Sequence, residues 1–240
     1  MKIHPLFRWF GSKYNSVKHY PAPEHSTIIE PYAGSASYSL HYADRKIVIW
    51  DRDPNLQGLW HWLILSATQS DIADIPVDVP VGTDIRSLGL NPGQELLMKH
   101  WQRTNNVGDC WTVSPWNGKP GLWSLRTRAR VSEEVSAIKH WRIEHPSTYA
   151  AVPSTWFIDP PYQYNYRYRS DLPPFEFEAL AATVHNAHPL SQVICCEAVC
   201  SKTGAVPSYL PFEPSHRAVT SRRKAEHSHH SNELIYVRPR

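Results

Sequence analysis

The chain has 240 residues, of which 41% are hydrophobic, and a formal net charge of +3 at pH 7. This length suits one α/β domain with a smaller insertion. The net charge is too small for the electrostatic field of the whole protein to attract a polyanion, so any nucleic-acid site has to be a local patch of positive charge. No apolar run is long enough to span a bilayer and the amino terminus lacks the apolar core of a secretion signal, so we expect a soluble cytoplasmic protein.

The first elements read as a turn, a strand and a glycine loop. Residues 8–14 (Arg-Trp-Phe-Gly-Ser-Lys-Tyr) form a glycine-centred turn flanked by aromatic and cationic side chains. Residues 26–30 predict a strand that a proline ends. Small residues around Gly34 let backbone N–H groups approach a ligand, and we expect Ser35 or Ser37 to cap the helix that follows. A loop with a single glycine is a poor phosphate site, so a cofactor without phosphate fits better.

The clearest strand of the sequence spans residues 46–50 (Lys-Ile-Val-Ile-Trp) and delivers Asp51 at its carboxyl end. Asp51 follows Gly34 by 17 positions. This is close to the spacing at which an acidic residue at the end of the second strand of a β-α-β unit binds ribose hydroxyls. Asp53 is placed to cap a helix over residues 56–65, whose apolar side chains recur at helical spacing and should pack on the sheet.

From about residue 70 the pattern changes. We expect residues 71–131 to be an inserted target-recognition region within a catalytic domain formed by residues 1–70 and 132–240. The insert should hold a connection, a helix over residues 95–103, and then a hairpin or loops punctuated by glycine and proline. Arginine, asparagine and aromatic side chains interleave in its last part, where they indicate either a solvated basic face or contacts to bases and phosphates. The candidates for nucleic-acid contact are Asn105, Trp116, Arg126, Arg128 and Arg130.

A short apolar run at residues 156–158 (Trp-Phe-Ile) predicts a buried strand, which the prolines of residues 159–162 (Asp-Pro-Pro-Tyr) end. The Asp159 carboxylate, the Pro160 carbonyl and the Tyr162 ring are thereby held at a strand's carboxyl end, where open α/β sheets bind ligands. Two acceptors beside a stacking ring suit a reaction at a planar exocyclic amine. The structural alternative is a proline-closed strand whose aspartate caps the next turn.

The remaining expected elements are a capped helix over residues 132–141, a helix over 175–187, a buried strand over 192–199, and an antiparallel pair over 217–221 and 233–238. The polar, tyrosine-rich loop after the Asp-Pro-Pro-Tyr turn suits either a mobile lid over the site or a strip that binds nucleic acid, and it adds Tyr166 and Arg167 as candidates for nucleic-acid contact. Cys195 and Cys196 should be reduced, buried thiols. Residues 227–230 (His-Ser-His-His) read as a solvated loop, with a metal site as the alternative.

In this order the elements resemble the Dam-like class of DNA adenine-N6 methyltransferases. Residues 9–13 look like the family's aromatic-x-Gly-x-Lys element, residues 30–34 like its cofactor loop, and residues 159–162 match its catalytic tetrapeptide. The resemblance implies a Rossmann-like, S-adenosylmethionine-dependent methyltransferase fold, an α/β fold with a mixed sheet and flanking helices. The implied catalytic residues are Asp159, Pro160, Pro161 and Tyr162. The implied cofactor contacts are Trp9, Gly11, Lys13, Glu30, Tyr32, Gly34, Asp51 and Asp159, and no metal is implied.

The function implied by this resemblance is site-specific methylation of adenine N6 in double-stranded DNA by base flipping. The enzyme would be a monomer or weak dimer in a bacterium or phage-infected cell, working alone or in a restriction-modification pair. The chain departs from the family at Ser35 and Ala36, where further glycines are usual, and at Cys196 and Glu197, where a Ser-Asn pair is common. The insert matches loosely, so the target sequence stays open. Methylation of RNA adenine or of cytosine N4, and a catalytically silent DNA-binding relative, remain alternatives.

Overall fold

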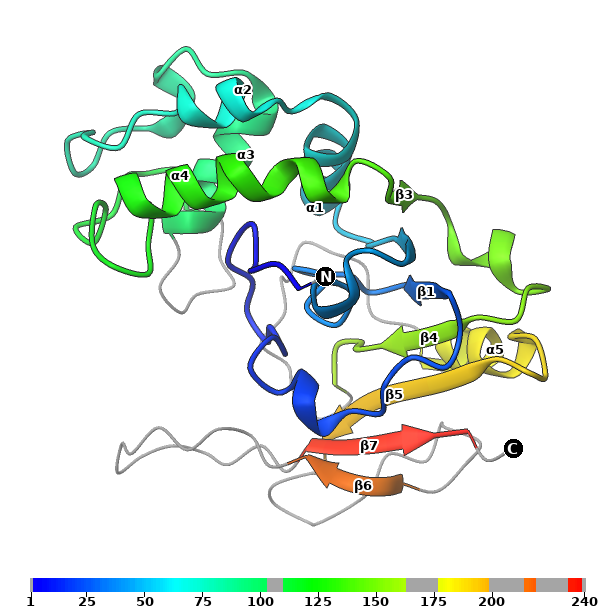
Figure 1. Ribbon diagram of the computed structural model, residues 1–240. Coiled ribbons are helices and arrows are strands. Elements are labelled where there is room, and N and C mark those ends of the chain that lie inside the picture. Colours follow the sequence, from blue (N-terminus) through cyan, green and yellow to red (C-terminus); the bar gives the residue numbers. More distant parts are fainter. Residues whose placement is uncertain (1, 103–109, 163–176, 199–213, 219–232, 239–240) are drawn as a thin grey trace, which may run out of the picture.

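The computed structural model describes residues 2–102, 110–162, 177–198, 214–218 and 233–238. Within these residues seven strands form one sheet in the order β3-β2-β1-β4-β5-β7-β6. The strands are β1 (Thr27–Glu30), β2 (Lys46–Ile49), β3 (Arg142–Ile143), β4 (Thr155–Ile158), β5 (Gln192–Ala198), β6 (Pro214–Ala218) and β7 (Glu233–Val237). Their order runs from β3 at the top of Figure 1 to β6 at the bottom.

The sheet is mixed. Strands β1 to β5 pair in parallel, whereas β7 runs antiparallel to both β5 and β6. The order 3-2-1-4-5 of the parallel part is that of a Rossmann sheet. The Rossmann-like α/β fold predicted from the sequence is therefore confirmed, and so is the antiparallel pairing of the two last strands.

Both faces of the central sheet are covered by apolar side chains that alternate along each strand. Ile28 of β1 and Phe157 of β4 face the larger core cluster, whereas Ile29 and Trp156 face a second cluster. A strand that is buried on both faces reads as a continuous apolar run, which is why these strands could be predicted from short Ile-, Val- and Phe-rich segments.

The helices are α1 (Pro54–His61), α2 (Gln69–Ala73), α3 (Pro92–Gln102), α4 (Leu125–Glu134) and α5 (Phe177–Asn186), with a π-helical turn η3 (Trp62–Ser66). Short 3-10 turns are η1 (Val17–His19), η2 (Ser39–Tyr42), η4 (Ile85–Ser87), η5 (Val135–Ile138) and η6 (Pro146–Tyr149). Residues of α1, α3 and α4 join the larger core cluster, and α5 joins the second. In Figure 1, α3 and α4 accordingly lie above the strands, and α5 lies behind β4 and β5.

Two helix predictions are wrong. The helix expected after the glycine loop is only the 3-10 turn η2, and its N-cap is Tyr38 without a capping side chain. Gly34 and Ala36 both have positive φ angles, 48° and 49°, and two left-handed residues so close together prevent a helix from starting there. The helix expected from residue 132 starts earlier, as α4, whose N-cap Ser124 accepts a hydrogen bond from Thr127 N–H at 3.3 Å.

Residues 71–131, expected to be an insert, share the larger core cluster with the sheet. Ile72, Leu97 and Val131 belong to the same cluster as Ile47 of β2. The segment therefore packs directly on the sheet, and its role as a recognition region stays a prediction. No helix in the described part of the chain is long and apolar enough to cross a membrane.

Candidate functional site

The candidate site lies where three neighbouring parallel strands end. Strand β1 ends at Glu30, β2 leads into Asp51, and β4 leads into Asp159. Strands β1 and β4 are neighbours, but the chain leaves β1 toward β2 on one side and reaches β4 on the other. Such a reversal opens a crevice outside the carboxyl ends of the strands, and open α/β sheets bind their ligands there.

The loop after β1 is held in one conformation by Gly34. Its φ of +48° is left-handed, and a Cβ atom on it would lie 2.5 Å from Cδ1 of Trp9. The Gly34 N–H donates to Asp51 Oδ2 at 2.9 Å, and Trp60 Nε1 donates to the Gly34 carbonyl at 2.9 Å. Any side chain here would displace Trp9, so the packing requires glycine.

Asp51 links this loop to β2 and α1. Besides the Gly34 N–H, its carboxylate accepts the Asp53 N–H at 3.0 Å, and Asp53 in turn caps α1 by accepting the Asn55 N–H. The predicted N-cap is confirmed. Burial raises the pKa of Asp51 to about 6. Each carboxylate oxygen has two lone pairs, so Asp51 can still accept hydrogen bonds from ligand hydroxyls while it holds the loop.

Glu30 is 2% exposed, and its Oε1 accepts the Ser39 N–H at 2.5 Å. Burial raises its pKa to about 8, and the negative charge of Asp159 adds to the rise, while the hydrogen bonds from Ser39 oppose it. Glu30 therefore fastens the turn after the glycine loop to the end of β1. Its expected contact with the cofactor stays a prediction.

Ser35 and Ser37 do not cap a helix but bond to the amino-terminal turn. The Ser12 hydroxyl lies 2.8 Å from that of Ser37 and 3.2 Å from that of Ser35, and the latter two lie 3.1 Å apart. The Dam-like family that the sequence resembles usually has a glycine at position 35. Here the Ser35 hydroxyl instead connects the loop to Ser12. The departure noted in the sequence has a structural role.

The amino-terminal turn brings Lys13 to the Asp-Pro-Pro-Tyr turn. Lys13 Nζ lies 3.0 Å from Asp159 Oδ2 and donates to the Gly11 carbonyl at 3.1 Å. The same ammonium lies 4.9 Å from the centroid of the Tyr162 ring, and the residue is only 9% exposed. A nitrogen donor thus sits beside a carboxylate and an aromatic ring at the end of β4.

The other predicted residues of this edge differ in burial and in the core cluster that they contact. Pro160 is buried, Asp159 and Pro161 are half-buried, and Tyr162 packs against the larger core cluster. Tyr32 packs against the second cluster, and burial, before smaller charge effects, raises its pKa to about 12. Its phenol is therefore neutral across the physiological pH range.

The residues predicted to contact nucleic acid fall into three groups. Asn105, Tyr166 and Arg167 lie outside the described residues. Trp116 is 53% exposed with Lys119 5.5 Å from its ring, and Arg126 is exposed on the first turn of α4. By contrast, Arg128 donates to the Ile75 carbonyl and Arg130 to the Pro5 carbonyl, both at 3.0 Å. These two arginines therefore have structural partners within the chain.

Sequence reasoning missed the roles of Trp60 and His100. Trp60 was expected only as a packing residue of α1, yet its indole N–H fixes the Gly34 carbonyl. His100 is buried in α3, and its ring centroid lies 5.6 Å from that of Trp9. Neither role had a local signal, because both depend on how α1 and α3 pack against the amino-terminal segment.

Cysteine and metal chemistry add nothing to this site among the described residues. Cys195 and Cys196 are buried, as expected, and neither they nor Cys110 forms a disulfide. Within the described ranges no cluster of three or more His, Cys, Asp or Glu side chains could hold a metal ion. The histidines at residues 227–230 lie outside those ranges.

Glu30 leads to a prediction about pH. Its carboxyl keeps its proton to about pH 8 in the folded protein, whereas the ordinary value is 4.5. Between these values the unfolded chain binds fewer protons than the folded one, so the free energy of unfolding should fall as pH rises from 5 to 9. Asp51, raised to about 6, acts in the same direction at the lower end of this range.

The variant Glu30→Gln should lose most of this pH dependence, because its neutral amide oxygen can still accept the Ser39 N–H. Urea unfolding between pH 5 and pH 9 measures the effect. The exposed Glu133→Gln serves as the control and should follow the wild type. Equal slopes for Glu30→Gln and wild type would show that Glu30 is already ionised in the folded protein.

Comparison with known proteins finds matches among solved structures only. No protein-family model and no curated protein sequence matches the chain. Among solved structures, the rRNA methyltransferase AviRa from Streptomyces viridochromogenes is similar at 14% sequence identity and a TM-score of 0.45. The match covers 98% of this chain and 87% of that one.

Proposed function

We propose that this protein is a site-specific DNA methyltransferase that transfers a methyl group from S-adenosylmethionine to the exocyclic N6 of adenine. The observation that carries the proposal is the arrangement of Lys13, Asp159 and Tyr162. A nitrogen donor lies 3.0 Å from the carboxylate and 4.9 Å from the ring centroid. An exocyclic amine beside Lys13 would donate to the same carboxylate, whose oxygens have further lone pairs, while its heterocycle stacks on Tyr162.

The carboxyl edge of the sheet fits the proposed cofactor. Asp51 ends β2 next to the glycine loop and can accept hydrogen bonds from ribose hydroxyls, as acidic residues do at this position of Rossmann folds. The loop offers no cluster of glycine N–H groups for a phosphate, which agrees with a cofactor that has none. When bound, S-adenosylmethionine supplies an electrophilic methyl group on a sulfonium.

The chain's own residues would prepare the amine. The adenine leaves the duplex, at a cost of a few kcal/mol for unstacking, and Tyr162 stacks on it. Asp159 and the Pro160 carbonyl accept the two N6 hydrogens, which keeps the nitrogen lone pair out of the ring. S-adenosylmethionine, held by Asp51 and the Gly34 loop, would supply the methyl group to this nitrogen and would leave as the neutral thioether. The alkylated nitrogen is acidic and loses its proton afterwards, so no strongly perturbed general base is required.

The proposed partner is double-stranded DNA, bound by a monomer or weak dimer in the cytoplasm. The exposed Trp116 and Arg126 support a contact surface of an aromatic ring and a cation, which suits bases and phosphates. The Asp-Pro-Pro-Tyr turn would present any exocyclic amine equally well. An assay of this function therefore has to include RNA as a substrate and has to detect methylation of cytosine N4.

The deciding assay incubates the protein with radiolabelled S-adenosylmethionine and, side by side, unmethylated bacterial DNA and RNA. Digestion to nucleosides then identifies the labelled base. Label in N6-methyladenine from DNA supports the proposal. Label confined to RNA or to N4-methylcytosine would replace the proposed substrate, and measurable DNA binding without any label would favour a catalytically silent relative.

A further inference from the structure

The segment that carries Trp9 and Lys13 is irregular. Residues 2–13 contain no helix or strand, and the first regular turn is η1. At its start the Ile3 N–H donates to the Leu40 carbonyl at 3.0 Å. An irregular segment that places an ammonium within hydrogen-bond distance of Asp159 needs fixed points elsewhere, because backbone freedom over ten residues would otherwise spread the Lys13 position widely.

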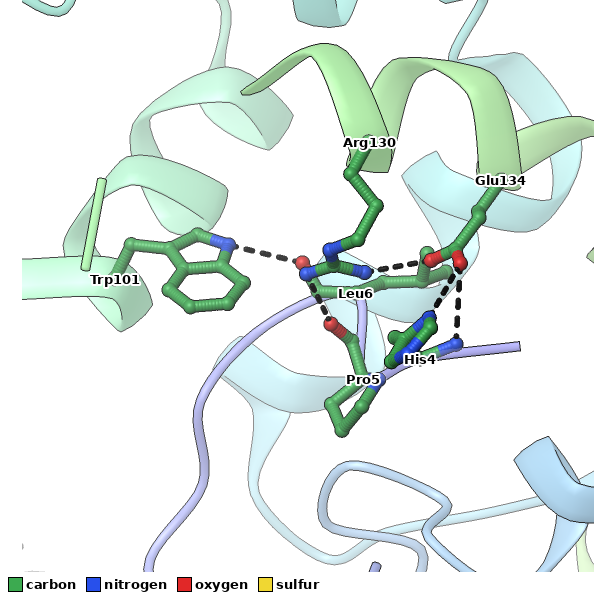
Figure 2. A network of polar contacts seen from close by, with 6 residues as sticks. All are labelled: His4, Pro5, Leu6, Trp101, Arg130 and Glu134. Atoms are coloured by element: carbon green, nitrogen blue, oxygen red, sulfur yellow. Dashed lines mark hydrogen bonds and ion pairs between the residues drawn. The ribbon is translucent and has the colours of Figure 1, made fainter. Parts of the chain in front are cut away.

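Helix α4 supplies two of these fixed points (Figure 2). Arg130 donates to the Pro5 carbonyl at 3.0 Å and pairs with Glu134 at 2.6 Å. Glu134 Oε1 accepts the His4 N–H at 3.3 Å and lies 2.8 Å from His4 Nδ1. Arg130 and Glu134 are one helical turn apart, so a single face of α4 holds the backbone of two successive residues.

Helix α3 supplies the next fixed point. Trp101 Nε1 donates to the Leu6 carbonyl at 2.9 Å, and the Arg130 guanidinium carbon lies 5.8 Å from the centroid of the Trp101 ring. Figure 2 shows the indole and the guanidinium reaching the same stretch of chain from two helices. One polar backbone atom in each of residues 4, 5 and 6 is thereby hydrogen-bonded to a side chain of α3 or α4.

Aromatic packing continues from this network to the glycine loop. The Phe7 ring lies 5.1 Å from Trp60 and 5.3 Å from His100, measured between centroids, and Trp9 lies 5.6 Å from His100. Trp60 binds the Gly34 carbonyl, and Trp9 packs on Gly34 itself. Close-packed side chains transmit displacement, so a shift at residues 4–6 reaches both the loop and Lys13.

We propose that Arg130 and Glu134 are positioning residues, whose clamp on residues 4 and 5 aligns Trp9 with the glycine loop and Lys13 with Asp159. The effect on catalysis rests on the methyltransferase function proposed above, whereas the clamp itself does not. This role replaces the sequence-based expectation that Arg130 contacts nucleic acid. Its planar fork is already shared between the Glu134 carboxylate and the Pro5 carbonyl, a pairing that lysine cannot reproduce.

Hydrogen exchange tests the clamp without any cofactor or nucleic acid. In Arg130→Gln and Glu134→Gln, the backbone amides of residues 4–13 should exchange at least about tenfold faster than in wild type, while amides of β4 and β5 keep their rates. Glu133→Gln is the matched control, since it makes the same change at the neighbouring, exposed position of α4. Unchanged exchange at residues 4–13 in both variants would overturn the clamp.

Steady-state kinetics then separate positioning from nucleic-acid contact. For Arg130→Gln and Arg130→Lys we expect kcat to fall about tenfold or more, because small misplacements of reacting groups are costly. The KM for DNA and the salt dependence of binding should stay as in wild type. A lost phosphate contact would instead raise KM, reduce the salt slope by about one, and be rescued in part by lysine. That second pattern would overturn the positioning role. If the wild-type protein transfers no methyl group, the proposed function is wrong, and the hydrogen-exchange result alone decides whether the clamp exists.

Discussion

Replacement of Asp159 by alanine is expected to reduce methyl transfer by roughly a thousandfold, the upper range for removing one preorganised group from a reaction centre. Asp159 stands at the carboxyl end of β4 and already accepts a hydrogen bond from a nitrogen, that of Lys13, at 3.0 Å. Without it the target amine loses an acceptor that orients its lone pair. Affinity for DNA should change by less than about threefold, because the proposed contacts to the duplex lie on other residues. Single-turnover methylation and equilibrium DNA binding measure the two effects.

The variant Asp159→Asn separates orientation from charge. Its amide oxygen can still accept one hydrogen bond, so we expect its methyl-transfer activity to lie between those of the alanine variant and the wild type. The same oxygen remains a partner for Lys13, so the fold should be destabilised less than in the alanine variant. Asp78→Ala removes an exposed aspartate between α2 and η4 and should behave as wild type. Normal turnover by Asp159→Ala would refute the assignment of the catalytic turn.

The elements of the fold that could be predicted are those with strong local patterns. Residues 46–49 and 155–158 are short apolar runs followed by breakers, and both are strands with an aspartate just beyond their ends. Because parallel strands end at one edge of a sheet, Asp51, Asp159 and the Gly34 loop lie at the same edge. Strand β3, only two residues long, had no such pattern and was not predicted.

The helices show where local patterns were insufficient. Residues 132–134 (Ser-Glu-Glu) look like a helix start, but α4 begins at Leu125 because Ser124 caps it and Val131 reaches the core. Arg126, Arg128 and Arg130 were interpreted either as contacts to nucleic acid or as part of a solvated basic face. Two of them bind backbone carbonyls of segments far away in sequence, and no local pattern contains that information.

Replacement of Gly34 by alanine is expected to lower the free energy of unfolding by about 2–5 kcal/mol. A left-handed φ costs a residue with a Cβ about 1–2 kcal/mol, and overpacking adds about 1–3 kcal/mol. The added Cβ would lie 2.5 Å from Trp9 Cδ1 and 2.8 Å from Trp9 Nε1, so the indole has to move. Urea unfolding measures the stability, and S-adenosylmethionine affinity should fall at least about tenfold, since 1.4 kcal/mol of lost binding suffices for that.

The chain offers controls that separate the two contributions. Gly89 also has a positive φ, +69°, but a Cβ on it would meet nothing within 4 Å. Gly89→Ala should therefore show the backbone cost alone and leave cofactor affinity unchanged. Adding Trp9→Ala to Gly34→Ala removes the clash, so the double variant should lose less than the sum of the two single losses. The opposite result would be that Gly34→Ala and Gly89→Ala lose the same free energy of unfolding and that the losses of Gly34→Ala and Trp9→Ala are strictly additive. Trp9 would then move away at no cost, and its packing on the loop would not stabilise the site.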